Sequence, residues 1–280
     1  MFTVRDAQLP CFVMNALTWL SGPVANSLTG SLPSSLEALT MLHTFIVNFN
    51  DLNGSLAPLS KMTSLQTLEV VSNSFSGPLP SAWDQLGHLS YLDVWNNRLT
   101  GTLPNELGAL TQLTFLGLGD NQFNGPLPEA LTPLTALRDL ELFHNEFTST
   151  IPSSLAQMTA LTSLSLGANQ LTGKLPTELA ALIELTWLAV HINGITGSLP
   201  VEYAALTNLR LFSVRENELT GKVPVEFAAQ WSEIDDVQLQ GNSLRGAVPF
   251  CSPGKEFARM IADCAEMQCP CCTSCIYRGG

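Results

Sequence analysis

The sequence predicts an α/β solenoid, in which short coils of the chain stack into a right-handed horseshoe. A parallel β-sheet is expected on the concave face, and short helices or 3-10 turns on the convex face. The first observation behind this prediction is an asparagine that recurs every 23 to 25 residues along most of the 280-residue chain. The second is an alternation of leucines before each asparagine, and the third is a proline after it in most copies.

The repeat is most regular in residues 89–113, which read LSYLDVWNNRLTGTLPNELGALTQL. A fixed period of this length is typical of a solenoid, in which each coil contacts only its neighbours and buries its leucines by stacking. The recurring asparagines are Asn26, Asn50, Asn73, Asn97, Asn121, Asn145, Asn169, Asn193, Asn217 and Asn242.

Each element of the coil follows from its residues. Leu116 and Leu118 are two residues apart, so their side chains share one face of a short strand, and stacked strands form a parallel sheet with a spacing of about 4.8 Å. The repeated asparagine both donates and accepts hydrogen bonds, so we expect it to satisfy backbone groups in its own and the adjacent coil, a structural role. A proline such as Pro104 fixes φ and begins the convex return, which has room for only a short helix.

The second half of the coil reads LTGSLP, FSGPLP, LTGTLP, FNGPLP, LTGKLP, ITGSLP and LTGKVP in seven copies. This motif resembles the LxGxIP signature of plant-type leucine-rich repeats, and the resemblance covers about residues 26–249. It implies a leucine-rich-repeat solenoid of the secretory pathway that binds a protein or peptide ligand on its concave face, as receptor-like ectodomains do. It implies an extracellular or cell-surface location, no enzyme activity and no cofactor.

Three segments are predicted along the chain. Residues 1–25 depart from the repeat and are interpreted as a degenerate N-terminal coil, with a signal peptide as the alternative. Residues 26–249 form the solenoid, and residues 250–280 form a Cys-rich cap in which residues 255–265 are expected to be a short helix. The strands of nine full coils are expected to be centred near residues 45, 68, 92, 116, 140, 164, 188, 212 and 237.

Six of the seven cysteines fall in the cap: Cys251, Cys264, Cys269, Cys271, Cys272 and Cys275. We interpret them as three disulfides, because extracellular repeat proteins are commonly capped in this way, and we assign no pairs. The alternative is a zinc site, since Cys272 and Cys275 have the spacing of a ligand pair. The ADC and CPCC motifs at residues 262–264 and 269–272 resemble the Cys-rich tail of diatom leucine-rich-repeat proteins.

Composition narrows the class of partner. The chain has 12 basic and 24 acidic residues, a net charge of −12, which opposes binding to nucleic acid or to an anionic membrane. No apolar run approaches the roughly 20 residues of a membrane span. Asn53 begins a glycosylation sequon, Asn-Gly-Ser, which favours the secretory interpretation.

The concave face is where the coils differ. Residues two, four and six places before the repeat asparagine should point into it, and these columns hold several aromatic and charged side chains. We interpret the aromatic residues as contact area and the carboxylates as partners for a basic or hydroxyl-rich ligand. The alternative is that the aromatic residues pack along the sheet and stabilise it. The candidate ligand-binding residues are Tyr91, Asp93, Trp95, Phe115, Asp139, Glu141, Phe143, Trp187, His191 and Arg215.

Other functions have weaker support in the sequence. Glu69 and Asp93 on adjacent coils could bring two carboxylates about 5 Å apart, as in retaining glycosidases, but no enclosing pocket is implied. A Thr-rich column three residues past the asparagine favours ice binding, although the column two places further on is mixed. A glycan-binding or inhibitor-type defence protein is a further alternative. The Thr-rich column comprises Thr29, Asn53, Ser76, Thr100, Asn124, Thr148, Thr172, Thr196 and Thr220.

Overall fold

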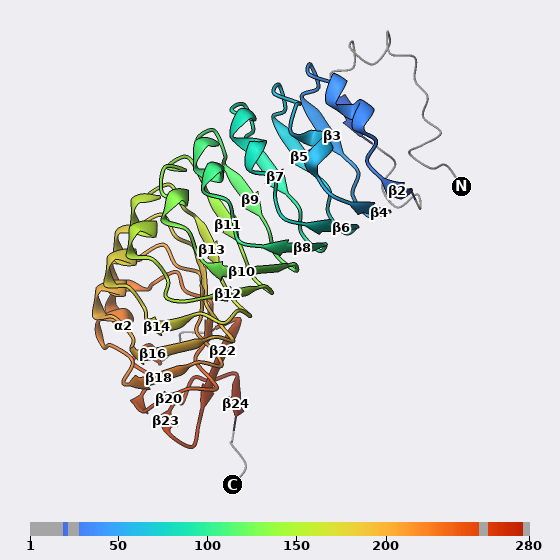
Figure 1. Cartoon of the computed structure of the whole chain (residues 1–280). Helices are drawn as coiled ribbons and strands as arrows, with labels where there is room; N and C mark the ends of the chain where they lie inside the picture. The colour runs from blue at the N-terminus through green and yellow to red at the C-terminus, as the bar shows by residue number, and fades with distance from the viewer. Residues whose placement is uncertain (1–18, 22–27, 252–256, 277–280) are drawn as a thin grey trace. The chain divides into compact units, whose positions relative to one another are not determined.

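The computed structural model describes residues 19–21, 28–251 and 257–276 (Figure 1). It divides into two compact units, Met1–Glu146 and Phe147–Gly280, and each is described by itself. Most of the expected leader or degenerate coil lies outside the described residues, as do Cys11 and Asn26. Within that segment, β1 (Trp19–Ser21) pairs in parallel with the next strand of the sheet, β3 (Thr44–Ile46).

The first unit contains a parallel sheet in which consecutive coils contribute neighbouring strands. Leu68 lies opposite Leu92, and Leu92 opposite Leu116, so equivalent residues of successive coils are in register. Its strands are β1, β3 (Thr44–Ile46), β5 (Thr67–Glu69), β7 (Tyr91–Asp93), β9 (Phe115–Gly117) and β11 (Asp139–Glu141). A second set of parallel strands comprises β2 (Thr29–Ser31), β4 (Asp51–Gly54), β6 (Ser74–Gly77), β8 (Arg98–Gly101) and β10 (Gln122–Pro126). The 3-10 helices are η2 (Ser34–Ala38), η3 (Ala57–Leu59), η4 (Ser81–Gln85), η5 (Asn105–Ala109) and η6 (Glu129–Leu131).

The second unit repeats this plan. Its main sheet comprises β13 (Ser163–Ser165), β15 (Trp187–Ala189), β17 (Leu211–Ser213), β19 (Asp236–Gln238), β22 (Arg259–Asp263) and β24 (Ser274–Ile276). Its other strands are β14 (Thr172–Lys174), β16 (Gly194–Ser198), β18 (Glu218–Gly221), β20 (Ser243–Leu244), β21 (Gly246–Ala247) and β23 (Met267–Gln268). Its helices are η7 (Ser153–Gln157), η8 (Thr177–Ala181), η9 (Val201–Ala205) and α2 (Glu226–Gln230), and β12 (Glu146–Thr148) contains the boundary between the units.

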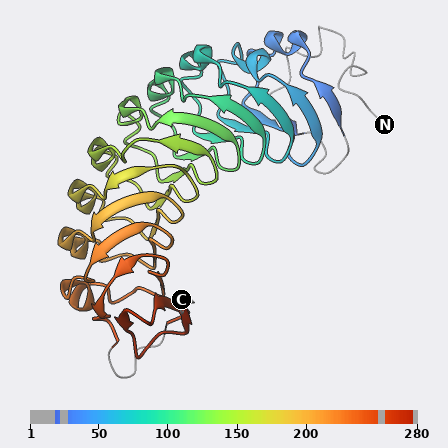
Figure 2. The ribbon, with the colours of Figure 1, turned by 60° about the horizontal axis from the view of Figure 1, so that its bottom comes forward.

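In each unit the main strands lie on one side and the helices on the other (Figure 2). The predicted solenoid with a parallel sheet and short helices is confirmed, and the nine strands are centred on the residues expected from the repeat. Among the residues that the structure describes, no helix is both long and apolar enough to cross a membrane. Hereafter, the side of the main sheet that faces away from the leucine core is termed the sheet face.

The asparagine ladder satisfies the backbone as predicted. Asn97 is 8% exposed, and its Nδ2 donates to the carbonyls of Val70 (2.9 Å) and Val94 (3.0 Å) in two successive coils. Its Oδ1 accepts from the backbone N–H of Phe75 at 3.0 Å. An unpaired buried amide costs free energy, so the same residue type recurs wherever the chain leaves a strand.

The predicted helix at residues 255–265 is wrong. Residues 259–263 form β22, which pairs in parallel with β19 and carries the sheet one strand further. Met260 and Ala262 are fully buried, and Arg259 and Ile261 are more exposed, a period of two over residues 259–262 that favours a strand. Pairing also satisfies the edge of β19, which would otherwise expose unpaired backbone groups.

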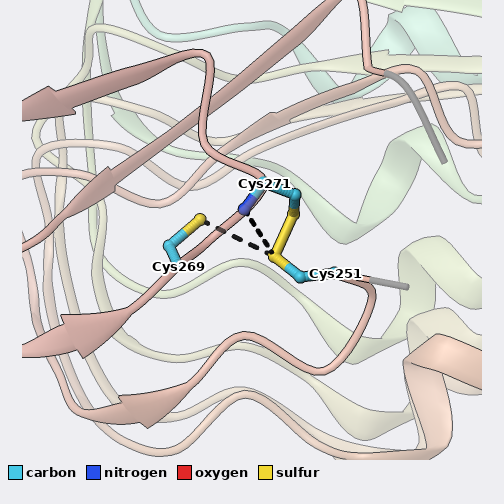
Figure 3. A group of neighbouring side chains, drawn as sticks. All are labelled: Cys251, Cys269 and Cys271. Carbon is cyan, nitrogen blue, oxygen red and sulfur yellow. Dashed lines mark hydrogen bonds between the residues drawn. A yellow bond between two sulfur atoms is a disulfide. The ribbon is translucent and has the colours of Figure 1, made fainter. Parts of the chain in front are cut away.

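All six described cysteines of the cap are paired, as Cys251–Cys271, Cys264–Cys275 and Cys269–Cys272. The Cys251 and Cys269 sulfurs are 3.9 Å apart, and the backbone N–H of Cys271 donates to Cys251 Sγ at 3.3 Å (Figure 3). These three sulfurs lie within 4.8 Å of one another, a spacing that a metal could use. Zinc binds thiolates, however, so zinc binding here would first require reduction of two disulfides.

Candidate ligand-binding surfaces

The strand pattern sets which side chains reach the sheet face. In β7 the central Leu92 is fully buried, and Tyr91 and Asp93 on either side of it are partly exposed. Trp95 and Phe143, each two residues before a repeat asparagine, are also partly exposed. Seven of the predicted ligand-binding residues lie on this face of the first unit and are termed the unit-1 surface: Tyr91, Asp93, Trp95, Phe115, Asp139, Glu141 and Phe143.

Two aromatic rings of the unit-1 surface stack across neighbouring strands. Tyr91 and Phe115 are register partners, with ring centroids 4.4 Å apart and an interplanar angle of 6°. A cross-strand aromatic pair of this kind contributes roughly 0.2–1 kcal/mol to stability. The packing alternative therefore accounts for part of these residues' burial, while their remaining exposed area stays available for contact.

Glycines between the rings determine how the other aromatic side chains lie. A Cβ on Gly119 would be 2.8 Å from Phe143 Cε1 and 3.0 Å from Trp95 Cδ1, so both rings cover this glycine. A Cβ on Gly117 would be 2.8 Å from Phe115 Cε1 and 2.7 Å from Asp93 Oδ1. The glycines are therefore part of the surface, because any larger residue would displace the rings that lie over them.

A polar network fixes Trp95 from the adjacent coil. The indole Nε1 of Trp95 donates to Asp120 Oδ2 at 2.7 Å, and Asp120 Oδ1 is hydrogen-bonded to His144 Nδ1 at 2.7 Å. Asp120 and His144 occupy the position just before the repeat asparagine, where φ is positive (48° and 50°). The candidate residues two, four and six places before the asparagine do not include this column. Its fixed distance from the asparagine is the signal that would have revealed it.

Burial and mutual repulsion perturb the carboxylates of this surface. Burial raises the pKa of Asp93 to about 6. A hydrogen bond from the Trp95 backbone N–H, at 3.0 Å, opposes this rise, and the nearby Glu69 carboxylate adds to it. Burial, then Asp93 and Asp139, raises the pKa of Glu141. Burial and the nearby carboxylates raise the pKa of Tyr91 to about 12. The three sheet-face columns of the described coils of unit 1 contain no Lys or Arg, so the surface is acidic.

The side chains of Glu69 and Asp93, the two carboxylates compared above with those of retaining glycosidases, have structural roles. Glu69 and Asp93 are register partners on β5 and β7, as predicted. Glu69 Oε2 accepts from Asn48 Nδ2 at 2.7 Å, and the Asp93 carboxylate accepts from the Trp95 backbone. Both carboxylates are thus held by groups of their own sheet.

The other three predicted residues, Trp187, His191 and Arg215, lie together on the sheet face of the second unit. They line an open hollow of about 380 Å³, termed the unit-2 hollow. Trp187 is 44% exposed. The sequence did not reveal the contribution of β22, because that segment was expected to be helical. The remaining lining residues are Ala189, Leu211, Ser213, Gln238, Gln240, Arg259 and Ile261.

The cations of the unit-2 hollow are oriented by carboxylates outside its lining. Arg259 donates to Asp236 Oδ2 from Nε (2.9 Å) and Nη2 (2.6 Å), and this hydrogen bonding raises the pKa of Arg259. Arg215 Nη1 donates to Glu216 Oε1 at 2.6 Å. Neither Asp236 nor Glu216 lines the hollow. Among the described residues, the charged groups that line it are the two guanidinium groups, and His191 lines it as well.

The family model described as Leucine Rich Repeat matches residues 88–110, 136–158 and 160–182. No curated protein matches the chain. Among solved structures, the ectodomain of the Arabidopsis thaliana receptor kinase GASSHO1/SCHENGEN3, in complex with CASPARIAN STRIP INTEGRITY FACTOR 2, is 32% identical, with a TM-score of 0.78. That match covers 80% of this chain and 27% of the ectodomain.

Two further structures are similar over more of this chain. A TDR receptor is 27% identical with a TM-score of 0.86, covering 93% of this chain and 45% of the receptor. A plant ice-binding protein is 26% identical with a TM-score of 0.60, covering 85% of this chain and 84% of that protein. The chain thus spans less than half the length of the two receptor structures it matches. Its repeat motif, its parallel sheet and these likenesses together make it a leucine-rich-repeat protein of the plant receptor ectodomain type.

Proposed function

We propose that this chain is a non-enzymatic recognition module that binds a protein or peptide ligand on the unit-1 surface. The observation that carries the proposal is the set of aromatic rings held over glycines and stacked across strands, yet still partly exposed. Rigid aromatic side chains provide contact area with little loss of conformational entropy on binding. The GASSHO1/SCHENGEN3 ectodomain was solved with a bound factor, which supports the analogy.

The chemistry of the surface favours a ligand with basic side chains. Glu69, Asp93, Asp139 and Glu141 lie among the aromatic rings, and burial and mutual repulsion raise the pKa of Asp93 and Glu141. A ligand ammonium or guanidinium group beside these carboxylates would relieve the repulsion and favour their ionised form. Electrostatic complementarity would also raise the association rate at low salt.

The test is a selection of peptides from a display library on the purified chain, followed by calorimetry of the selected peptides. Trp95→Ala and Phe143→Ala should each keep the circular dichroism spectrum and weaken binding by more than about 2 kcal/mol. Met41→Ala removes an exposed hydrophobic side chain outside the surface and should leave affinity unchanged. Equal affinities of all three variants and the parent would reject the site.

An extracellular or cell-surface location, with glycosylation at Asn53, belongs to the same proposal. Three disulfides in one small cap persist in an oxidising compartment, and the similar GASSHO1/SCHENGEN3 structure is that of an ectodomain. Asn53 is exposed on β4, where a glycan could be accommodated. Peptide mapping of secreted protein, before and after glycan removal, tests the assignment.

Ice binding is a second candidate, favoured by the similarity to a plant ice-binding protein over most of both chains. Three Thr hydroxyls of this column in the second unit have a structural use, however. Thr172, Thr196 and Thr220 donate to backbone carbonyls of the preceding coil at 3.4, 3.2 and 3.3 Å. We therefore expect no thermal hysteresis from the purified chain, and measurable hysteresis that is lost in Thr196→Val would favour this candidate instead.

A further inference from the structure

The unit-2 hollow combines an exposed aromatic ring, several amide and hydroxyl groups, and two guanidinium groups. Its described lining contains no carboxylate, although the whole chain carries a net charge of −12. A hollow of about 380 Å³ is at the small end of ligand sites, which measure about 300–1,000 Å³. This composition differs from that of the unit-1 surface and indicates a different ligand.

We propose that the unit-2 hollow is a second binding site, which takes an anionic saccharide, a pyranose bearing a carboxylate or a sulfate group. The proposal concerns residues that the peptide site does not use. It assigns the ring of Trp187, the amide of Gln240 and the two guanidinium groups to three different parts of one sugar.

Trp187 provides the platform. It is among the few large hydrophobic side chains that are strongly exposed, at 44%, and its register partners on the sheet are Ser163 and Leu211. The small serine on one side leaves the indole ring without a bulky neighbour there. A pyranose has one face made mainly of C–H groups, which can lie flat against an indole while its hydroxyl groups remain solvated or hydrogen-bonded.

Gln240 provides an acceptor for a sugar hydroxyl. Its Oε1 is buried and has no hydrogen-bond partner among the described residues. A buried polar group without a partner is unfavourable, and this oxygen is closed to solvent, so a ligand hydroxyl reaches it only when the Gln240 side chain rotates toward the hollow. That rotation and the new hydrogen bond would remove a cost already present in the free protein. Ser213 and Gln238, which are hydrogen-bonded to each other at 3.3 Å, line the same hollow.

The guanidinium groups provide the charge selectivity. A guanidinium group has five N–H donors, and Arg259 uses Nε and Nη2 on Asp236 while Arg215 uses Nη1 on Glu216. Among the described residues no partner is found for the remaining donors, and the paired carboxylates hold each side chain in place. Planar or tetrahedral oxyanions, a carboxylate or a sulfate, match the geometry of such donors.

The test is calorimetry of the whole chain with three probes: trigalacturonate, a chondroitin sulfate disaccharide and the neutral maltotriose. At least one anionic probe should bind with a Kd below about 1 mM, and maltotriose should bind at least about tenfold more weakly. The first two probes distinguish a carboxylate from a sulfate as the recognised group. Affinity for the anionic probe should fall as salt is raised.

Variants locate the site. Trp187→Ala and Arg215→Gln should each lower the affinity for the anionic probe more than about tenfold, with an unchanged circular dichroism spectrum and melting temperature. Arg210→Gln is the matched control, because Arg210 is in the same unit, is paired with Glu233 at 3.7 Å and does not line the hollow. This control should bind as the parent does.

Several results would overturn the proposal. The first is that neither anionic probe binds. The second is that maltotriose binds as tightly as the anionic probes. The third is that Trp187→Ala and Arg215→Gln bind the anionic probe as tightly as the parent chain does. Stronger binding of a peptide with a free C-terminal carboxylate than of either saccharide would assign the hollow to a different ligand. Trp95→Ala should not affect the saccharide, so this proposal and the peptide site succeed or fail separately.

Discussion

The two units are built from the same coil but present different sheet faces. In the first unit, aromatic rings lie among carboxylates, and the described sheet-face columns contain no Lys or Arg. In the second, the described lining of the hollow contains two guanidinium groups, a more exposed tryptophan and two side-chain amides. The asparagine ladder and the leucine core are alike in both. The scaffold therefore constrains the buried positions, and the sheet-face positions vary without disturbing it.

The largest expected effect is a loss of stability in the second unit alone, because the disulfide-bonded cap belongs to that unit. Cys264→Ser combined with Cys275→Ser removes the disulfide that links the end of β22 to β24 and should destabilise the second unit by about 2–4 kcal/mol. Hydrogen exchange should rise in β19 and β22, and should not change in β5 and β7 of the first unit. Equal loosening of both units would contradict the idea that the cap protects its own unit.

The next prediction tests whether the scaffold is the same in both units. Asn97→Ala and Asn217→Ala each remove a buried amide that bonds two carbonyls and one N–H at 2.9–3.0 Å. Each should lower the free energy of unfolding by about 1–3 kcal/mol, and by similar amounts. Asn105→Ala, at an exposed position in η5, is the control. Urea denaturation measures all three.

Gly119→Ala tests how far peptide binding depends on the positions of the aromatic rings on the sheet face. The added Cβ would approach both Phe143 and Trp95, so it should cost about 1–3 kcal/mol of stability and weaken peptide binding by moving both rings. Gly87→Ala is matched, because a Cβ there meets nothing within 4 Å, and it should change stability by no more than about 0.5 kcal/mol. Unperturbed peptide affinity in Gly119→Ala would show that the rings need not lie over the glycine.

The smallest expected effect is a pH dependence carried by the unit-1 surface. Asp93 has a pKa of about 6 in the folded chain and an ordinary value of 3.8, so between these values the folded protein binds the proton more readily. Stability should therefore fall as the pH rises from about 4 to about 6, by about 1 kcal/mol after allowance for solvent exposure. Asp93→Asn should flatten this part of the profile measured by thermal denaturation.

Asp84→Asn, which alters an exposed carboxylate on η4, is the control for this profile and should keep its slope. A slope that persists in Asp93→Asn would mean that other groups, Glu141 among them, dominate the pH dependence. Glu141 contributes with the same sign, because burial and its acidic neighbours also raise its pKa.

The fold was predictable to the level of single strands because the repeat states the same local pattern nine times. Leu116 and Leu118 were expected to share one face of a strand from alternation alone, and each is fully buried. The cap could not be predicted in this way. Its residues 259–263 occur once, and their strand conformation depends on pairing with β19. The open edge of the sheet, which only the folded coils create, therefore decided the conformation of this segment.

The candidate residues were chosen by column, and the structure gives each a partly or largely exposed position on a sheet face. Their use as a ligand site remains a prediction. The partners that orient them were not predictable: Asp120 with Trp95, and Arg259 with Asp236, lie more than 20 residues apart in sequence. Such pairs depend on the register between coils and on rotamers, which a periodic pattern does not specify.

The sequence by itself determined the period, the inward leucines, the hydrogen-bonding asparagines and the columns that stay free of the core, because each is a local requirement repeated in every coil. Only the tertiary structure decided which rings lie over Gly119 and which cysteines pair. It also decided that β22 adds Arg259 to the hollow of the second unit. These are contacts between different coils or within a segment that has no repeat, and their energies arise only when the chain is packed.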